Sequence, residues 1–287
     1  MSTAAAVESA LMITGQTPRY DKLDGNSLSF QQMVSCDTKN QNGCGGGNIM
    51  YAAKYAWQNN DFDNDRLGGL LSYRDYPYED FLGVLKGPTG QCNTTGKVPS
   101  AYLNFPQVVN SVNDRTSFDK RKQLLMEAVA QQPVASVLKS DCDLLMSYEG
   151  GVLTTDEGCQ CCEASCIDHA IVIVGYNATA PVPYWKLRNS WGVGWGEGGH
   201  FRVAMDPEGC GWGLFGVLAE AALPSEAYAT LDELPERPGW WATSTTAAKV
   251  LVILASSFLG CCLCGMIGLA IRKRMEKEDE SNEGEEK

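Results

Sequence analysis

A histidine and an asparagine twenty residues apart are the residues of this sequence best suited to chemistry. His169, one of only two histidines, precedes the apolar run 170–176, and Asn189 follows a second short run at 184–187. If these runs are neighbouring strands, the amide of Asn189 accepts the Nδ1 proton of His169 and leaves Nε2 facing a nucleophile. An imidazole held in this way is the general base of a Cys-His-Asn nucleophilic site.

Other residues of these types have simpler interpretations. His200 fits an aromatic packing position, and the glycine-rich run 192–196 leads into a strand, which disfavours a phosphate-binding loop. The crowded cysteines before His169 could form either a zinc cluster or disulfides. They are Cys159, Cys161, Cys162 and Cys166. We favour disulfides and expect neither a metal nor a cofactor.

Helices and short strands must position these residues. Helical patterns cover residues 4–12 and 49–57, the second after the glycine-rich turn 43–47. From about residue 105 the pattern changes to short β-type runs separated by Gly, Pro and Asp. These runs are 133–138, 170–176, 184–187 and 200–203. We therefore expect an α+β fold in which a helical half precedes a sheet-rich half.

Composition limits the class of protein. The 287 residues are 44% hydrophobic and 20% charged, which is typical of a globular protein of about two domains. The formal net charge of −12 excludes a protein that wraps nucleic acid through phosphate contacts. Nine cysteines precede residue 211. In an oxidising compartment an odd number indicates a reactive thiol, an intermolecular bridge or a partner outside this sequence.

Residues 250–271 have the character of a membrane span. The run holds no charged residue and, as a helix, would be roughly 33 Å long, enough for a hydrocarbon core of about 30 Å. Trp240 and Trp241 precede it and the cations 272–274 follow it. This order predicts a single-pass, type I topology with a lumenal or extracellular ectodomain, at an endomembrane, lysosome or cell surface. A buried soluble helix is the alternative.

Further features concern the membrane and the secretory route. Small residues four apart in the span favour self-association, at Ser256, Gly260, Cys264 and Gly268. Asn93 and Asn177 begin glycosylation motifs. The first thirteen residues lack the basic and apolar regions of a signal peptide. Either the membrane segment targets the chain, or residues upstream of Met1 are missing.

Four ordered motifs resemble those of the papain-like cysteine proteases, the family of papain and the cathepsins. They are LSFQQMVSCD at 28–37, GCGGG at 43–47, DHAI at 168–171 and NSWGVGWGE at 189–197. The resemblance covers roughly residues 1–223. It implies a papain-like two-domain α+β fold, with a helical left domain and a β-barrel-like right domain, and a peptide substrate hydrolysed by thiol acylation.

The resemblance also implies roles for individual residues. His169 would be the general base and acid, Asn189 would orient its ring, and Trp191 would shelter their hydrogen bond from water. Gly46 and Gly47 would pair their backbone with an extended substrate. Val137, Ile167 and Ala170 match positions that line the family's main specificity pocket. Asp168 and Trp195 match positions at the border of the cleft. An apolar pocket favours an apolar substrate side chain two residues before the cut.

The beginning of the chain departs from the family pattern. Ser2 and Glu8 match a Ser and a Glu of the helix that carries the family's nucleophile, so the nucleophilic Cys would lie three positions before Met1. We therefore expect the chain as given to be inactive. The resemblance further implies a Cys36–Cys92 disulfide and a bridge from Cys210 to one of the loop cysteines. It leaves Cys44 with a missing upstream partner and the other bridges undetermined.

The sequence thus predicts a membrane-anchored thiol protease, a hydrolase and glycoprotein, in five segments. These are the helical half at 1–105, the sheet half at 106–223, a linker at 224–249, a transmembrane helix at 250–271 and a cytosolic tail at 272–287. A membrane-anchored pseudoprotease that binds peptides or a partner is the alternative. A Cys-rich adhesion ectodomain would explain the disulfides and the anchor but not the His and Asn motifs.

Overall fold

The structure is a computed structural model that describes residues 1–16, 27–38, 41–58, 69–78, 92–104 and 106–229. The predicted membrane span 250–271, the tail 272–287 and residues 230–249 of the predicted linker lie outside these ranges. Of the helices within them, none combines the length and apolar character that a bilayer span requires.

Strands of the sheet half surround the predicted histidine. In the described part of the chain, seven strands form one sheet in the order β2-β8-β3-β5-β6-β7-β4. Neighbouring strands are antiparallel except β4 and β7. Their bounds are β2 Pro106–Asn110, β3 Val134–Leu138, β4 Val152–Leu153, β5 His169–Asn177, β6 Tyr184–Arg188, β7 His200–Ala204 and β8 Ala221–Pro224. The four predicted β-type runs are confirmed as β3, β5, β6 and β7.

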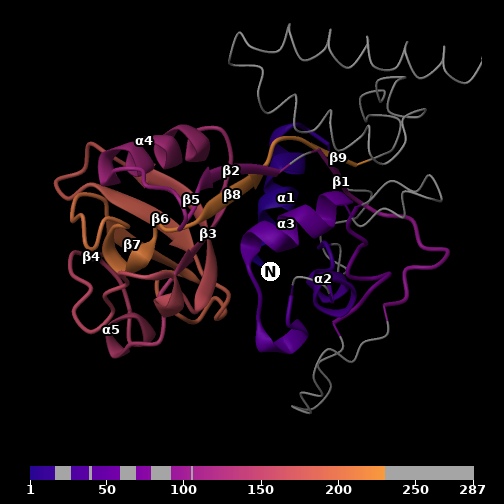
Figure 1. Cartoon of the computed structure of the whole chain (residues 1–287), viewed down its shortest axis with the longest axis horizontal. Coiled ribbons are helices and arrows are strands. Elements are labelled where there is room, and N and C mark those ends of the chain that lie inside the picture. The colour runs from indigo at the N-terminus through magenta and orange to yellow at the C-terminus, as the bar shows by residue number, and fades with distance from the viewer. Residues whose placement is uncertain (17–26, 39–40, 59–68, 79–91, 105, 230–287) are drawn as a thin grey trace, which may run out of the picture. The chain divides into compact units, whose positions relative to one another are not determined.

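Helices dominate the other half (Figure 1). The predicted helices are confirmed as α1 and α3, and a short pair of strands, β1 and β9, closes this half. The bounds here are α1 Ser2–Ile13, α2 Phe30–Cys36, α3 Ile49–Gln58, β1 Tyr102–Leu103 and β9 Ala227–Tyr228, with a 3-10 turn at Gly43–Gly45. In the sheet half lie α4 Phe118–Val129, α5 Asp143–Met146 and the 3-10 turns Ala164–Cys166 and Leu214–Gly216. The predicted α+β fold is confirmed.

Apolar periodicity explains how α1 joins the two halves. Its alanines favour a helix, and Val7 and Leu11 lie one turn apart and fully buried in the helical half. On another face of α1, Ala6 packs with Ile49 of α3 and with Ala135 and Val137 of β3. This shared cluster fixes the first turn of α1 beside the sheet, so the beginning of α1 and the beginning of β5 border the same space.

The sequence did not predict α2, α4 or α5, although α2 and α4 each have a capping signal. Ser29 accepts a hydrogen bond from the backbone N–H of Gln32 at the start of α2. Ser117 accepts one from Lys120 at the start of α4. Such side-chain caps satisfy N–H groups that a helix start leaves unpaired. The cap of α4 went unnoticed because the surrounding segment was assigned to strands.

The predicted linker begins later than residue 224. Pro224 ends β8, and Ala227 and Ala229 are buried in the core of the helical half. β9 pairs with β1, so the chain returns from the sheet to the helices after β8. Composition alone assigns residues 225–229 to a linker. They belong to the fold because β9 pairs with β1 and because the alternating residues Ala227 and Ala229 are buried.

Arg121 of α4 is a buried cation whose side-chain hydrogen bonds within the described ranges all go to backbone carbonyls. It is 1% exposed. Each of its five N–H groups donates to a main-chain oxygen, at distances of 2.6 to 3.3 Å. The acceptors belong to Ser111, Asp114, Thr116, Leu218 and Ala219. The guanidinium therefore holds α4 to the turn before it and to the segment that leads into β8.

We expect Arg121→Lys to lower stability strongly, because lysine keeps the charge but supplies three donors in place of a five-donor fork. Buried carbonyls left without a partner cost about 3 kcal/mol together, which lowers Tm by roughly 6–12 °C for a domain of this size. Thermal unfolding measures this. Lys120→Gln, which removes an exposed neighbouring cation, is the control. Equal Tm values for the two variants would contradict the assignment.

Candidate active site

The fold brings His169 and Asn189 together at one end of two neighbouring strands. His169 is the first residue of β5, and Asn189 directly follows β6. The two strands are antiparallel, with Val172 opposite Arg188. His169 Nε2 lies 2.8 Å from Asn189 Oδ1. The sheet register therefore places the imidazole and the amide in hydrogen-bond contact.

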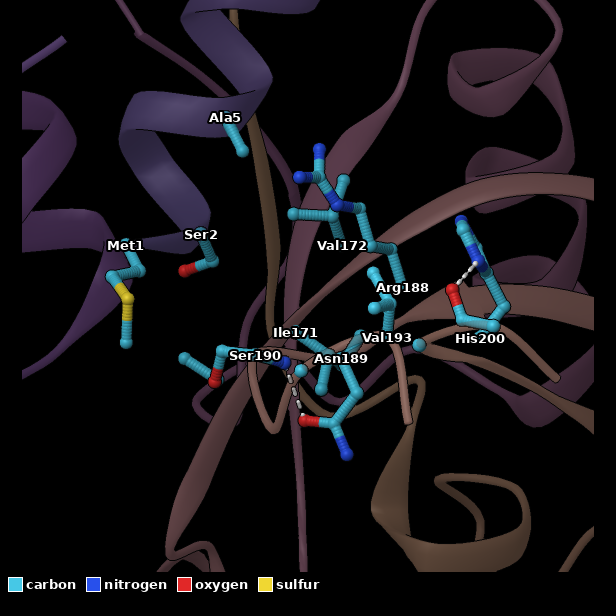
Figure 2. Close-up of a pocket in the computed structure, with 14 residues that line it drawn as sticks. Met1, Ser2, Ala5, Ile171, Val172, Arg188, Asn189, Ser190, Val193 and His200 are labelled. Atoms are coloured by element: carbon cyan, nitrogen blue, oxygen red, sulfur yellow. Dashed lines mark hydrogen bonds between the residues drawn. The ribbon is translucent and has the colours of Figure 1, made fainter. Parts of the chain in front are cut away.

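A second hydrogen bond determines which ring nitrogen carries the proton. The backbone N–H of Ser190 donates to Asn189 Oδ1 at 2.7 Å, the dashed bond between these residues in Figure 2. Because the oxygen of the amide is thereby identified, the His169 nitrogen facing it must be the donor. In the neutral ring this contact places the proton on Nε2 and leaves Nδ1 without one. The expectation that Nδ1 faces the amide is therefore wrong, because Nε2 is the nitrogen in contact with Asn189 Oδ1.

Aromatic rings lie against this pair. The ring of Trp191 is 5.3 Å from that of His169 and tilted by 36°. Asn189 is 8% exposed, and its Nδ2 has no hydrogen-bond partner among the described residues. Trp195 packs edge-on against Trp191 at 5.0 Å. The two rings therefore pack beside the His169–Asn189 pair.

A cavity of about 300 Å³ lies between Asn189 and the start of α1. Figure 2 shows the first turn of α1 on one side and the segment after β6 on the other, labelled at Met1, Ser2, Ala5, Arg188, Asn189 and Ser190. A neighbouring cavity of about 210 Å³ is lined by Met1, Ser2 and Ala170, and also by Gly46 and Gly47. The predicted substrate-binding glycines thus lie across the same hollow from the strand that begins with His169.

The backbone at Gly46 and Gly47 is exposed, and each position favours glycine for a different reason. Gly46 has φ +99°, a conformation that favours glycine. A Cβ at Gly47 would overlap the amide of Gln41, which accepts from the N–H of Asn48 and donates to its carbonyl, both at 2.8 Å. Gln41 therefore holds this exposed backbone in place.

The predicted pocket residues cluster between the two halves. Val137 of β3 pairs with Ala170 of β5 in the sheet register. Val137 belongs to the cluster of Ile49 and Ala135, and Ile167 and Ala170 pack against it. The three residues that the resemblance assigned to the pocket are thus neighbours on one apolar wall.

The border residues have different surroundings. The carboxylate of Asp168 accepts from the backbone N–H groups of Ser140 and Asp141 at 2.6 and 3.1 Å. It therefore ties the start of β5 to the turn after β3. Trp195 donates from Nε1 to the carbonyl of Met146 at 3.2 Å, which fixes it to the end of α5.

The sequence analysis missed a polar connection close to the apolar wall. Glu220 is 7% exposed, and its carboxylate accepts from Asn48 Nδ2 at 2.7 Å. Burial raises the pKa of this carboxyl group. Glu220 stands alone in the apolar stretch 214–224, and this isolated charge was the available signal. The contact links the start of α3 to the start of β8.

Four disulfides join eight of the cysteines that the structure describes. They are Cys36–Cys92, Cys142–Cys159, Cys161–Cys166 and Cys162–Cys210. Cys210 therefore pairs with a loop cysteine, as the resemblance implies. Cysteines paired in this way are not free thiolate ligands for zinc. Cys44 lies in the turn at Gly43–Gly45, and its side chain lies outside what the structure describes.

The helix carrying Ser2 and Glu8 lines the hollow as the resemblance implies. Ser2 is buried at the first turn of α1 and lines both cavities. Glu8 accepts from the backbone N–H of Leu28 at 2.6 Å. Burial raises the pKa of the Glu8 carboxyl group, and the Leu28 hydrogen bond opposes this.

Comparison with known proteins gives the same family from three directions. A model described as "Papain family cysteine protease" matches residues 1–217. Cysteine proteinase EP-B 1 of Hordeum vulgare is 34% identical over 70% of this chain and 48% of its own length. Germination-specific cysteine protease 1 of Arabidopsis thaliana is 32% identical over 78% and 50%. The chain thus spans about half the length of these relatives.

Solved structures agree. The bromelain protease of Ananas comosus, in complex with the E64 inhibitor, has a TM-score of 0.57 and 27% identity. The Carica candamarcensis protease CMS1MS2, in complex with E-64, has a TM-score of 0.57 and 30% identity. Each alignment covers 78% of this chain and 86% of the other. With the site geometry above, these matches show that the chain belongs to the papain family of cysteine proteases.

Proposed function

We propose that the site is built for peptide-bond hydrolysis by thiol acylation. The observation that carries this proposal is the double acceptance at Asn189 Oδ1, from Ser190 at 2.7 Å and from His169 Nε2 at 2.8 Å. A ring oriented in this way presents Nδ1 as a base towards a thiol. Proton transfer to Nδ1 yields the thiolate, which attacks the peptide carbonyl. The imidazolium then protonates the departing amine, and the neutral ring activates water to hydrolyse the thioester.

The substrate would be an extended peptide held between the two halves. The exposed backbone at Gly46 and Gly47 pairs with it, and the apolar wall of Val137, Ile167 and Ala170 takes an apolar side chain. Trp191 shelters the hydrogen bond between base and amide, and Asp168 and Trp195 border the cleft. Burial of Val137 beside Ile49 supports the apolar preference.

The nucleophile is the remaining part of the site. We place it beside the first turn of α1, where Met1 and Ser2 line the hollow and where the positive end of the helix dipole favours a thiolate. Eight described cysteines are paired in disulfides and cannot supply it. Cys44 matches a disulfide position in the family pattern. Cys261, Cys262 and Cys264 belong to the apolar run 250–271, outside the described residues. The described part of the chain would therefore hold the base and its amide but not the nucleophile.

Adding residues before Met1 tests this arrangement. An extension that ends in Cys-Gly-Ser-Cys-Trp-Ala places a cysteine three positions before Met1. We expect this extended chain to react with an epoxide probe for active-site thiols and to cleave peptides. Its His169→Ala variant should lose about 10²–10⁴-fold in kcat/KM, the usual contribution of a general base. The 287-residue chain should not be labelled.

A Ser in place of the last added cysteine is the matched control and should abolish labelling. Specific labelling of the unextended chain that His169→Ala removes would contradict the missing nucleophile. A folded extended chain that neither reacts nor cleaves would contradict the assignment of His169 and Asn189.

We also propose that residues 250–271 anchor the protein, with the protease portion on the lumenal or extracellular side. The apolar run and the following cations support this topology. Asn93 and Asn177 are exposed, as glycan acceptors must be. Deleting 250–271 should release the protein from carbonate-washed membranes, whereas scrambling the same 22 residues should not.

Glycan shifts report the orientation independently. In the intact protein, glycosidase should increase the gel mobility, and Asn93→Gln or Asn177→Gln should remove part of the shift. A soluble full-length protein, or a membrane-bound one without any glycan and with a protease-protected tail, would contradict the proposed anchor and topology.

A further inference from the structure

The tryptophan that covers the His169–Asn189 pair lies in a segment with little regular structure. Residues 190–199 connect β6 to β7 and contain five glycines. Gly192, Gly196, Gly198 and Gly199 have positive φ angles. Such a backbone has wide conformational freedom. Trp191 is 38% exposed, so burial of its own ring does not fix its position. Other contacts must hold this loop over the site.

Aromatic packing connects the loop to the core. Trp195 contacts Trp191 at 5.0 Å and packs against the fully buried Phe201 at 5.4 Å. Tyr148 lies 5.6 Å from Trp195. A Cβ at Gly196 would come within 2.9 Å of the Tyr148 ring, so the loop is closely packed there. The position of Trp191 thus follows that of the Trp195 segment.

An ion pair fixes the far end of the same segment. Arg202 of β7 donates from Nε to Glu197 Oε2 at 2.9 Å and from its terminal nitrogen to Oε1 at 2.5 Å. Glu197 Oε1 also accepts from the backbone N–H of Gly151 at 3.1 Å. Tyr148 joins this set, since its hydroxyl donates to the Gly151 carbonyl and accepts from the Arg202 N–H. The carboxylate therefore joins the loop to β7 and to the turn before β4.

This geometry is more specific than a surface salt bridge. A two-point guanidinium–carboxylate contact restricts orientation as well as distance. Hydrogen bonds from Arg202 also hold the pKa of the Glu197 carboxyl group below its usual value. Backbone hydrogen bonds also hold this loop. The Glu197 N–H donates to the His200 carbonyl, and the Asn189 N–H donates to the Gly199 carbonyl. Glu197 thus lies within the same hydrogen-bonded turn that returns to Asn189.

We propose that Glu197 and Arg202 are positioning residues of the active site. Their ion pair holds the 190–199 loop so that Trp191 covers the hydrogen bond between His169 and Asn189. Neither residue touches the reacting atoms. The inference rests on the proposed function, which assigns His169 and Asn189 their roles. It adds two residues to those that limit the access of water to this pair.

Solvent exchange of the His169 Nε2 proton tests the proposal in the full 287-residue chain. In the parent protein, nitrogen-15-labelled histidine should show an Nε2–H proton that exchanges slowly with water. Glu197→Gln and Arg202→Gln should each speed its exchange about tenfold, because the loop opens more often. Trp191→Ala should have the same effect, and Arg202→Lys, which keeps the charge but not the fork, an intermediate one.

The two variants distinguish positioning from simple electrostatics. One removes an anion and the other a cation, so a direct charge effect on the ring would have opposite signs in the two proteins. A positioning role predicts faster exchange of the His169 Nε2 proton in both variants. Lys122→Gln is the matched control, since it removes the ion pairs of Lys122 with Asp119 and Asp206. It should leave the exchange rate of the His169 Nε2 proton unchanged.

Each outcome bears on the proposal. Folded variants that exchange at the parental rate, or that change in opposite directions, would show that the ion pair does not position Trp191. If substitution to Gln prevents folding, Arg202→Lys and Trp191→Ala decide the matter, since equal parental exchange in both overturns the inference. A parent protein without a protected Nε2 proton would instead overturn the base–amide geometry of the proposed function.

Discussion

One shared acceptor, the Oδ1 atom of Asn189, determines the chemistry available to this site. It receives the Ser190 backbone N–H and the His169 Nε2–H. An amide oxygen fixed from its own backbone cannot rotate to offer its NH2 group to the ring. The imidazole therefore keeps its proton on Nε2 and its lone pair on Nδ1. Every step of the proposed acyl transfer depends on this assignment, because only a neutral ring nitrogen can accept a proton from a thiol.

Packing between the two halves places this ring opposite a helix start. Ala6, Ile49, Ala135 and Val137 share one apolar cluster, so α1, α3 and β3 meet beside His169. The same meeting creates the hollow that exposes the glycine backbone on one side and the Asn189 segment on the other. The proposed substrate contacts, the proposed base and the helix dipole thus all belong to one interface. The disulfides and the Arg121 contacts stabilise the regions around it.

The sequence predicted elements whose signals are local and periodic. β5 and β6 follow from apolar runs, and the motif at 189–197 predicted which residues lie near His169. The prediction that Nδ1 faces the amide was wrong. Which ring nitrogen makes this contact depends on side-chain geometry, which the periodicity of the sequence does not encode. Glu220 was missed because its partner Asn48 lies far away in sequence. Arg121 was missed because two of its acceptors, Leu218 and Ala219, are distant and because nothing in the sequence marks the nearer carbonyls as its partners. Once buried, each of these two charged side chains must hydrogen-bond to a partner, and the partners become visible only in the folded structure.

The protonation of His169 tests the central claim most directly. Nitrogen-15 chemical shifts of the ring, recorded in the folded 287-residue chain at a pH where the imidazole is neutral, distinguish the two tautomers. Asn189→Ala, measured beside it, shows whether the amide selects between them. The account predicts a proton on Nε2 and an unprotonated Nδ1 in the parent, with a mixture of tautomers in the variant. A parent ring protonated on Nδ1, or one unchanged by Asn189→Ala, would contradict it.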